Sequence, residues 1–532
     1  MSERRSARAV LALLSDTGTF TEIPCAPREP TPDGPLGWQG YDASRARAAE
    51  RTGEEESVVC GTACVDGTRA VLTAFEFGFL GGSLGERTGD RLVAAYTYAR
   101  EHRLPVVPLI ATGGSRMQEG MLALTQLQRV ARQSALTREA GLPQIAVVRD
   151  PTTGGGWATL GAGADVVLAL PGAQVGFAGS RVRPPDADPA AYTAEAQLAA
   201  GSVDAVVTPA ELKGVLGSWL RLLSRGTSVR PGSASGTPPI PTRPGTTPDT
   251  AQPTTRPAGV PENAQDPTTT TRSAGLPTDA EEPTAPTHPA DLPQGEEEAV
   301  VSGGRGRQVA AAPVPAALGS AVLPVTGWDA VRRARSPERP RAQAYLDAYF
   351  TYRVALSGDR CGGADPDGML CGFGERDGRT VAYAAQTGTA TRPAGYRTAA
   401  RLIRLADRLG VPVLTVVDTP GAANDAEAER QGAGAAIAEV FGAVAAARVP
   451  VTTLVVGEGG SGGALALAAP GNTWATPDSY FSVIAPELAA AILKRPPDEV
   501  EATAGQLRIR PQDLVELGVV RGIVGHADRP QP

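Results

Sequence analysis

Runs of aliphatic and β-branched residues that end in glycine recur along this chain. The N-terminal part contains "LPVVPLIATGG" and "LPQIAVVRDPTTGGG", and the C-terminal part contains "VPVLTVVDTPG" and "VPVTTLVVGEGGSGG". Each run predicts a buried strand followed by a tight turn. The prolines near the starts of the runs are 38 residues apart in both parts, at Pro105 and Pro143 and again at Pro412 and Pro450. The shared spacing and the shared glycines indicate an internal duplication.

Apolar residues three or four positions apart predict helices that lie between these strands in sequence. One row consists of Met117, Met121, Leu124, Leu127 and Val130, and a second consists of Tyr396, Ala399, Ile403, Ala406 and Leu409. Gly410 is placed to end the second helix. Alternating strands and helices predict parallel sheets whose glycine turns lie at the carboxyl ends of the strands, where α/β folds place their ligands.

A long segment between the two parts lacks this patterning. From Ser224 to about Gly295 the sequence is dominated by Pro, Thr, Ser and Gly, with too few apolar residues to offset the entropy of ordering. We therefore predict domains at residues 1–225 and 326–532, joined by a disordered linker at 226–325.

Composition narrows the possible partners. The 532 residues carry a formal net charge of −7, which argues against nucleic acid or an anionic membrane as the main partner. No apolar stretch approaches the roughly 20 residues of a membrane span, and the N-terminus does not resemble a signal peptide. Five cysteines form no CxxC pair, so we expect no zinc site, and we expect a cytoplasmic protein.

The glycine turns are the candidate site. Glycine lets a ligand approach the backbone, and a helix that starts at such a turn presents N–H groups with partial positive charge, which suits an anion or an oxyanion. For any single glycine pair, a purely structural role in the turn is the simpler interpretation. No GxxxxGK[ST] phosphate loop is present, and none of His102, His288 and His526 is beside a glycine turn. The site therefore depends on backbone donors, with no side-chain base in evidence.

Several motifs resemble one enzyme family. "AFEFGFLGGSLGE", "TGGSRMQEG", "GLPQIAVVRDPTTGG" and "GFAGSRV" closely resemble the β subunit of bacterial acetyl-CoA carboxylase carboxyltransferase. "RPRAQAYLD", "LSGDR", "PAGYRTAARLIRLAD", "DTPGA", "GEGGSGGALA" and "YFSVIAPE" resemble its α subunit, in the family's order. The chain thus looks like a β–α fusion, although the four-Cys zinc ribbon that usually opens the β subunit is missing.

The resemblance implies a fold and a reaction. The fold is α/β, with two crotonase-like (ClpP/crotonase, ββα superhelix) domains joined by the linker. The reaction moves a carboxyl group from carboxybiotin on a carrier protein to acetyl-CoA and gives malonyl-CoA. The biotin anion itself can take the proton from the acetyl methyl group, so no protein base is required.

The resemblance also implies the site residues. One oxyanion hole would use Gly113, Gly114, Gly154 and Gly155, and the other Gly421, Gly462 and Gly463. Arg116, Gly179, Arg181 and Gly460 would bind substrate. Which hole serves the biotin and which serves the thioester stays open.

The implied partners are a biotin carboxyl carrier protein, a biotin carboxylase and a second copy of the chain, in a homodimer or a larger oligomer. Neither lysine has a Met neighbour, so the biotin must arrive on another protein and no cofactor is expected to be covalently bound. Two alternatives stay open. One is a carboxyltransferase for another acyl-CoA or a biotin-dependent decarboxylase component, and the other is a non-catalytic scaffold that keeps the fold.

Overall fold

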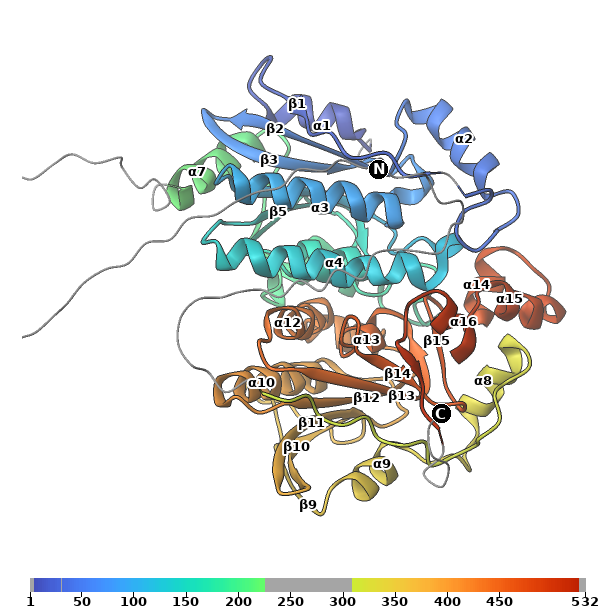
Figure 1. The fold of residues 1–532 in the computed structure, drawn as a ribbon. Coiled ribbons are helices and arrows are strands. Elements are labelled where there is room, and N and C mark those ends of the chain that lie inside the picture. Colours follow the sequence, from blue (N-terminus) through green and yellow to red (C-terminus); the bar gives the residue numbers. More distant parts are fainter. Residues whose placement is uncertain (1–3, 30, 225–308, 526–532) are drawn as a thin grey trace, which may run out of the picture. The chain divides into compact units, whose positions relative to one another are not determined.

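Two sheets with the same internal order organise the computed structural model, which describes residues 4–29, 31–224 and 309–525 (Figure 1). We call the described residues up to 224 the N-terminal half and those from 309 the C-terminal half. The first sheet has the order β1-β2-β3-β4-β5-β6-β8, with β7 beside β5, and the second has the order β16-β14-β13-β12-β11-β10-β9, with β15 beside β13. Because the central four strands of each sheet run in matching order, the duplication inferred from the sequence is confirmed.

The strands of the N-terminal half are β1 (Thr21–Glu22), β2 (Val58–Val65), β3 (Thr68–Phe75), β4 (Val106–Thr112), β5 (Ile145–Thr153), β6 (Val166–Ala169), β7 (Val175–Gly176) and β8 (Ala205–Val206). Those of the C-terminal half are β9 (Tyr352–Ala355), β10 (Met369–Arg376), β11 (Arg379–Gln386), β12 (Val413–Thr419), β13 (Val451–Gly460), β14 (Thr473–Ala475), β15 (Tyr480–Ser482) and β16 (Gly522–Ile523).

Each half opens its sheet with an antiparallel hairpin and continues with parallel strands. β2 pairs with β3 and β10 pairs with β11 in antiparallel fashion, whereas β3–β4–β5 and β11–β12–β13 are parallel. Asp66-Gly67 and Asp377-Gly378 form the two hairpin turns, and all four residues have positive φ. Asp-Gly suits a two-residue turn of this kind, since both central positions require left-handed backbone.

The helices of the N-terminal half are α1 (Ala7–Leu14), α2 (Tyr41–Thr52), α3 (Glu86–Glu101), α4 (Gly120–Glu139), α5 (Gly154–Gly156), α6 (Ala194–Ala199) and α7 (Leu212–Ser224). Those of the C-terminal half are α8 (Gly327–Arg335), α9 (Ala342–Tyr349), α10 (Pro393–Leu409), α11 (Ala426–Arg430), α12 (Ala433–Ala446), α13 (Ser461–Leu465), α14 (Pro486–Ile492), α15 (Val500–Gln506) and α16 (Pro511–Glu516). Short 3-10 turns lie at η1 (Leu80–Gly82), η2 (Met117–Glu119), η4 (Pro189–Tyr192) and η5 (Pro497–Glu499), and a π-helical turn, η3 (Trp157–Gly161), follows α5.

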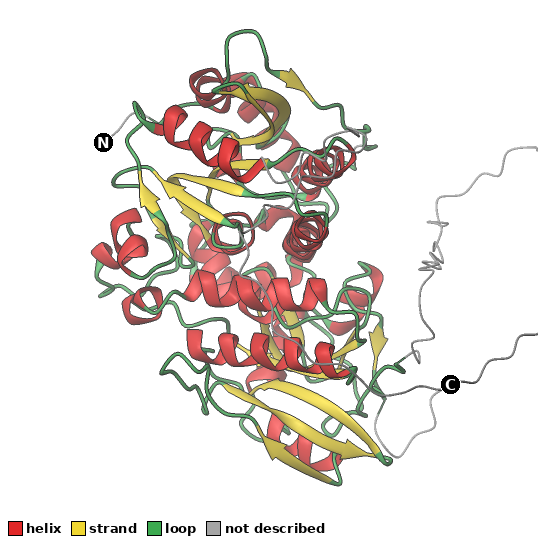
Figure 2. Ribbon diagram, turned by 90° about the vertical axis from the view of Figure 1, so that its left-hand side faces the viewer, coloured by secondary structure: helices red, strands yellow, loops and turns green. Residues whose placement is uncertain are grey.

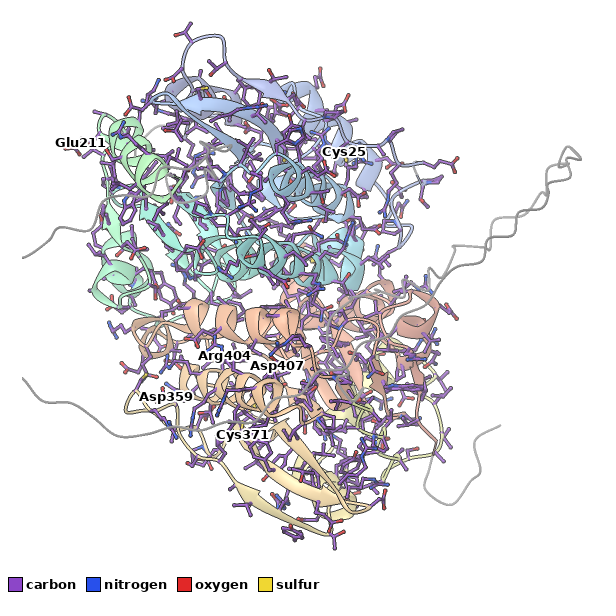
Figure 3. The ribbon with its side chains drawn as sticks, turned by 60° about the vertical axis from the view of Figure 1, so that its left-hand side comes forward. Cys25, Glu211, Asp359, Cys371, Arg404 and Asp407 are labelled. Carbon is purple, nitrogen blue, oxygen red and sulfur yellow. The ribbon has the colours of Figure 1, made fainter. Side chains whose placement is uncertain are left out.

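The two helices predicted from apolar spacing are present. α10 ends at Gly410, which adopts a left-handed φ of 66°, as predicted. Met117 lies in the 3-10 turn that precedes α4, so this row of apolar residues starts one turn before the helix does. Arg404 and Asp407 on α10 pair with Glu439 and Arg448, which joins α10 to α12 and to the segment after it (Figure 3).

Helices α4 and α12 join the halves. Arg132 on α4 donates to the carbonyl of Ala445 at 2.8 Å, and Gln128 donates to the carbonyl of Ala468 at 2.7 Å. One hydrophobic core includes Leu127 of α4 and Ile437 of α12, so it runs from one half into the other. The helices between the two sheets can be followed in Figure 2. Because the described residues of both halves belong to a single compact unit, a site can be built from both halves of one chain.

The predicted domain boundaries stay a prediction. Most of the expected linker, residues 226–308, lies outside the described residues. Residues 309–325 are described and contact the rest of the C-terminal half. Ala312 and Ala317 are buried there, and the N–H of Ala317 donates to the carbonyl of Gly525.

Candidate active site

The same hydrogen-bonded turn follows β4 in the N-terminal half and β12 in the C-terminal half. The N–H of Gly114 donates to Oγ1 of Thr112 after β4, and the N–H of Gly421 donates to Oγ1 of Thr419 after β12, both at 3.1 Å. Both glycines have positive φ, 107° and 142°, a region that other residues rarely adopt. The pairing between neighbouring strands also shifts register at the same place in both halves. The duplication therefore extends to the detail of the turn.

The next strand of each half leads into a short helix. Gly154 begins α5 and Ser461 begins α13, each 11 residues after its strand proline, and both have positive φ, 68° and 56°. Gly155 therefore corresponds to Gly462, and Gly156 to Gly463. Ser461 was not among the predicted site residues, because its left-handed backbone is visible only in the structure; left-handed φ is uncommon for a residue with a side chain.

Four of the seven predicted hole glycines already use their N–H groups within the protein. Gly114 and Gly421 donate to the threonines, Gly113 donates to the carbonyl of Gly81, and Gly154 donates to that of Phe177. Gly155, Gly462 and Gly463 lie in the first turns of their helices, where N–H groups have no helical acceptor. The N–H groups of these three glycines therefore lack a helical acceptor, whereas those of the other four are already bonded.

The N–H of Ala422 is a further donor that sequence reasoning missed. Among the described residues it has no backbone acceptor, while its neighbours Gly421 and Ala423 bond with Thr391. A Cβ atom on Gly463 would lie 2.5 Å from this nitrogen, so the turn after β12 and the start of α13 approach each other closely. The carbonyl of Gly463 accepts hydrogen bonds from Gln386 and Tyr396, which fixes the direction of this backbone.

Two side chains of the N-terminal half lie between the helix starts. A Cβ atom on Gly155 would lie 2.2 Å from Cδ1 of Leu127, and one on Gly462 would lie 3.8 Å from the same atom. The Gly462 position also faces the ring of Phe177 at 3.4 Å. The structure thus brings the two predicted sets of glycines to a shared apolar wall within one chain.

No alternative chemistry is assembled in the part of the chain that the structure describes. It contains no group of three or more His, Cys, Asp and Glu residues that could hold a metal ion. The one histidine there, His102, lies at the end of α3 with its ring stacked on Tyr98, and His288 and His526 lie outside the described residues. No helix in residues 4–29, 31–224 or 309–525 is long and apolar enough to cross a bilayer.

The cysteines are all described, and all five are free thiols. Cys25 lies in the N-terminal half and Cys371 in the C-terminal half (Figure 3). Burial raises the pKa of the Cys60 and Cys371 thiols to about 12, so both stay protonated at neutral pH. A buried neutral thiol behaves as a small apolar side chain.

Comparison with known proteins agrees with the geometry. The carboxyl transferase domain family matches residues 38–226, and the acetyl co-enzyme A carboxylase carboxyltransferase-like family matches residues 319–529. The acetyl-coenzyme A carboxylase carboxyl transferase subunits beta/alpha of Salinispora arenicola are 36% identical over 540 residues, which cover 98% of this chain and 82% of that protein. The chain belongs to this carboxyl transferase family. The protein of the same name from Saccharopolyspora erythraea is 35% identical over 500 residues, 91% of this chain and 74% of its own.

Both halves have the α/β architecture expected from the sequence, each with a sheet of the same central strand order. A solved structure of transcarboxylase 12S, titled as a hexamer with hydrolysed methylmalonyl-coenzyme A bound, aligns with 98% of this chain and 87% of its own. Its sequence identity is 18% and its TM-score 0.36.

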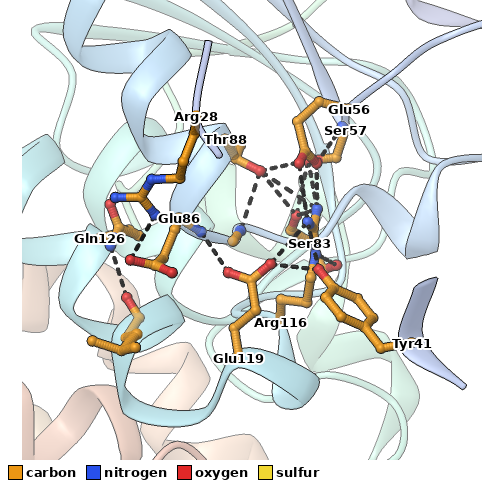
Figure 4. Close-up of polar contacts among 12 residues, drawn as sticks. Arg28, Tyr41, Glu56, Ser57, Ser83, Glu86, Thr88, Arg116, Glu119 and Gln126 are labelled. Carbon is orange, nitrogen blue, oxygen red and sulfur yellow. Dashed lines mark hydrogen bonds and ion pairs between the residues drawn. The ribbon is translucent and has the colours of Figure 1, made fainter. Parts of the chain in front are cut away.

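Arg116 lies in a buried network of polar side chains next to the first glycine turn, and Figure 4 shows this network. Its side chain is only 1% exposed, and it forms ion pairs with Glu56 at 2.5 Å and with Glu119 at 3.3 Å. It also donates to Oγ and the carbonyl of Ser83, next to Leu84, whose N–H donates to the carbonyl of Gly114. A guanidinium enclosed in this way is closed off from solvent and holds the turn.

The charge of Arg116 controls the protonation of its partner. Burial by itself raises the pKa of the Glu56 carboxyl. The charge of Arg116 and its hydrogen bonds outweigh burial and hold that pKa below its usual value. The pair therefore stays ionised at neutral pH.

The other predicted substrate contacts fall into two groups. Arg181 is exposed, on the segment that follows Phe177, and Gly179 lies beside Thr153 at the end of β5. Gly460 has no room for a side chain, since a Cβ atom would lie 2.0 Å from the carbonyl oxygen of Pro420. Its glycine is required by the close approach of β13 to the turn after β12.

A buried ion pair supports the second turn as Arg116 supports the first. Arg339 reaches Asp418, the residue before Thr419, at 2.6 Å, and both side chains are almost completely excluded from solvent. Asp418 also accepts a hydrogen bond from the N–H of Glu458 on β13. The ends of β12 and β13 are therefore tied together directly behind the turn.

Proposed function

We propose that the chain transfers a carboxyl group from carboxybiotin, presented on a separate carrier protein, to acetyl-CoA and so forms malonyl-CoA. The observation that carries this proposal is the pair of matching turns, each followed by a strand that leads into a helix start whose N–H groups have no helical acceptor, in a member of the acetyl-CoA carboxylase carboxyl transferase family. Negative charge develops on the thioester oxygen when the enolate forms and on the ureido oxygen when biotin loses the carboxyl group. Two sets of preorganised donors suit the two oxygens.

The donors come from defined positions in the two halves. Gly155 belongs to the first set, and Gly462, Gly463 and Ala422 belong to the second. One well-placed backbone donor stabilises an oxyanion in the transition state by about 3 kcal/mol in typical enzymes. Gly113, Gly114, Gly154 and Gly421 keep the turns in the conformation that exposes these N–H groups.

Proton transfer in this scheme needs no side-chain base. Carboxybiotin releases CO2, the nitrogen anion that remains takes a proton from the acetyl methyl group, and the enolate attacks CO2. The absence of imidazole from the two turns of the described structure is consistent with this route. The halves contribute position and electrostatic stabilisation.

Substrate contacts are assigned according to exposure. We retain Gly179 and Arg181 as substrate-binding residues, because Gly179 lies beside Thr153 at the end of β5 and Arg181, two residues later, is exposed. Arg116 and Gly460 are assigned to the support of the turns. Truncation of Arg181 should raise KM for malonyl-CoA, whereas truncation of Arg116 should lower protein stability.

The decisive assay is malonyl-CoA decarboxylation driven by free biocytin. We expect biocytin-dependent formation of acetyl-CoA, and we expect malonyl-CoA to be preferred over methylmalonyl-CoA and ethylmalonyl-CoA. If one of the longer-chain compounds were preferred, the substrate would be another acyl-CoA and not acetyl-CoA. Binding of a biotin carrier without any exchange would overturn the catalytic proposal in favour of a scaffold.

The proposed partners follow from the same reaction. A biotin carboxyl carrier protein must deliver the carboxyl group, and a biotin carboxylase must load that carrier, which places the chain in a multi-protein cytoplasmic enzyme. We also propose a homodimer or larger oligomer. Sedimentation of the purified chain tests this, and a fully active monomer of 54.5 kDa would refute it.

A further inference from the structure

Glu429 is a buried carboxylate that reaches from the C-terminal half into the N-terminal half. It lies on α11, its side chain is fully buried, and its Oε1 accepts a hydrogen bond from the N–H of Ala178 at 2.9 Å. Its Oε2 is buried and has no hydrogen-bond partner among the described residues. A buried carboxylate without full pairing costs stability, so its presence here calls for a functional explanation.

The segment that Glu429 holds contacts both glycine turns. The carbonyl of Phe177 accepts the N–H of Gly154, which begins α5, and the ring of Phe177 faces Gly462 at the start of α13. The residue before it, Gly176, pairs with Thr153 at the end of β5. Movement of residues 176–178 would therefore shift the wall between the two sets of donors.

Three other contacts join α11 and the residues just before it to the N-terminal half, and none of them involves residues 176–178. The hydroxyl of Tyr192 donates to the carbonyl of Asn424, and the side-chain amide of Asn424 donates to the carbonyl of Val182, both at 2.8 Å. Arg430 forms an ion pair with Asp188. These bonds hold residues 182–192, whereas residues 176–178 are held from α11 by Glu429.

The surroundings of Glu429 place its ionisation near neutral pH. Burial is the largest influence and raises the pKa of this carboxyl to about 7. The N–H groups of Ala178 and Phe177 and the charge of Arg183 lower the pKa, and the charge of Asp425 raises it. Tyr192 on η4 also faces the carboxyl. Helices α6 and α12 also pack against α11.

We propose that Glu429 is a positioning residue for carboxyl transfer, whose carboxylate form holds residues 176–178 between the two glycine turns. A hydrogen bond from a backbone N–H to a charged carboxylate is roughly twice as strong as one to a neutral acceptor. Protonation weakens this bond and loosens the wall between the donors. This inference rests on the proposed carboxyl transfer.

The test compares Glu429→Gln with Glu427→Gln, which changes an exposed carboxyl on the same helix. In biocytin-driven malonyl-CoA decarboxylation, wild-type kcat should rise several-fold between pH 6 and pH 8. Glu429→Gln should show a flat profile over this range and a kcat about 10-fold lower at pH 8, with KM changed less than threefold. Glu427→Gln should follow the wild type, and Glu429→Asp, which keeps the charge, should keep the rise with pH. A Glu429→Gln profile that overlays the wild type would overturn the inference.

Two further measurements keep the test decisive. Gly176→Ala is the second variant, for use if Glu429→Gln fails to fold. Its Cβ atom would lie 3.1 Å from Cδ1 of Tyr192 and 3.2 Å from Cδ of Glu429, so it crowds the carboxyl without removing it and should shift the pH profile. Amide hydrogen exchange of the peptide spanning 170–183 does not depend on catalysis. Faster exchange in Glu429→Gln than in the wild type supports the positioning role. If the wild type shows no carboxyl transfer, only the proposed function is refuted. Unchanged exchange refutes the positioning role.

Discussion

Gly462 faces Phe177 across the junction of the two halves, where a Cβ atom on the glycine would lie 3.4 Å from Cζ of the ring. This is an ordinary contact distance, so a methyl group fits there without displacing the backbone. The neighbouring positions differ. A Cβ atom on Gly463 would lie 2.5 Å from the backbone nitrogen of Ala422 and would distort the turn, whereas one on Gly155 would lie 2.2 Å from Cδ1 of Leu127 and would displace that side chain.

Gly462→Ala is therefore the cleanest test of the second donor set. The methyl group stands beside the N–H groups where an oxyanion must approach, and we expect turnover to fall on the order of 10²-fold with the melting temperature nearly unchanged. Gly442→Ala on α12, where no atom lies within 4 Å of the added carbon, is the matched control and should keep full activity. Equal activity of the two variants would remove this site from the mechanism.

Breaking the buried pair behind the first turn should cost stability and activity together. Glu56→Gln leaves the Arg116 guanidinium buried without its main counter-charge, a change that typically costs 3–5 kcal/mol. Glu55→Gln, whose side chain is 91% exposed, is the control and should cost less than about 1 kcal/mol. Urea unfolding at pH 7.5 measures both.

The Arg116–Glu56 pair should make the stability of the protein depend on pH in a defined direction. Because the folded pKa of Glu56 is lower than its unfolded value, its contribution to stability is present above about pH 4.5 and is lost as the pH falls further. The Glu56→Gln variant should therefore approach the wild type in stability as the solution is acidified. A difference that stays constant down to pH 3.5 would contradict this assignment.

The contribution of Glu429 to stability changes with pH in the opposite direction to that of Glu56. Its folded pKa, about 7, exceeds the usual 4.5, so the folded state binds the proton more tightly, and the resulting stability is present below about pH 4.5 and is lost as the pH rises to 7. This difference in pKa corresponds to roughly 3 kcal/mol. Glu429→Gln should therefore be more stable than the wild type at pH 8 and similar to it at pH 5, as measured by urea midpoints. A gain in stability combined with a loss of activity would separate a functional carboxylate from a structural one.

Replacing His102 should have little effect on catalysis. Its ring stacks on Tyr98 at the end of α3, and neither donor set includes imidazole. We expect His102→Ala to keep turnover within roughly threefold. A folded His102→Ala variant that loses two orders of magnitude would mean that a protein base takes part in the reaction.

The halves should function as separate chains. Residues 1–225 and 309–532, when co-expressed, are expected to reassociate into active enzyme through α4, α12 and the shared core. The second fragment should start at 309, because Ala312 and Ala317 are buried in the C-terminal half. Starting it at 326 instead should lower the yield of soluble complex. Soluble halves that regain no activity would count against a two-subunit origin.

The sequence predicted the strands, the two long helices and the positions of the glycine turns, because hydrophobic period and glycine placement are local properties. It could not separate the glycines that donate from those that shape the turn, since that depends on which N–H groups find acceptors such as Thr112 and Thr419. Arg116 was expected at the substrate, yet its partner Glu56 is 60 residues away in sequence and only the fold places them together. Ser461 and Glu429 were missed for the same reason. The role of Ser461 lies in a backbone angle, and that of Glu429 in a contact across 251 residues.

Leu127 lies against the helix starts of both halves, and this has a consequence for how the enzyme can change. One isobutyl group lines the approach to Gly155 and to Gly462, so a mutation that resizes it alters the space near both substrates at once. Selectivity for the acyl-CoA and acceptance of the biotin group therefore cannot be adjusted independently at this position. A lineage that adapts to a bulkier acyl chain through residue 127 must make a second, compensating change at the biotin side, and the two changes should be inherited together.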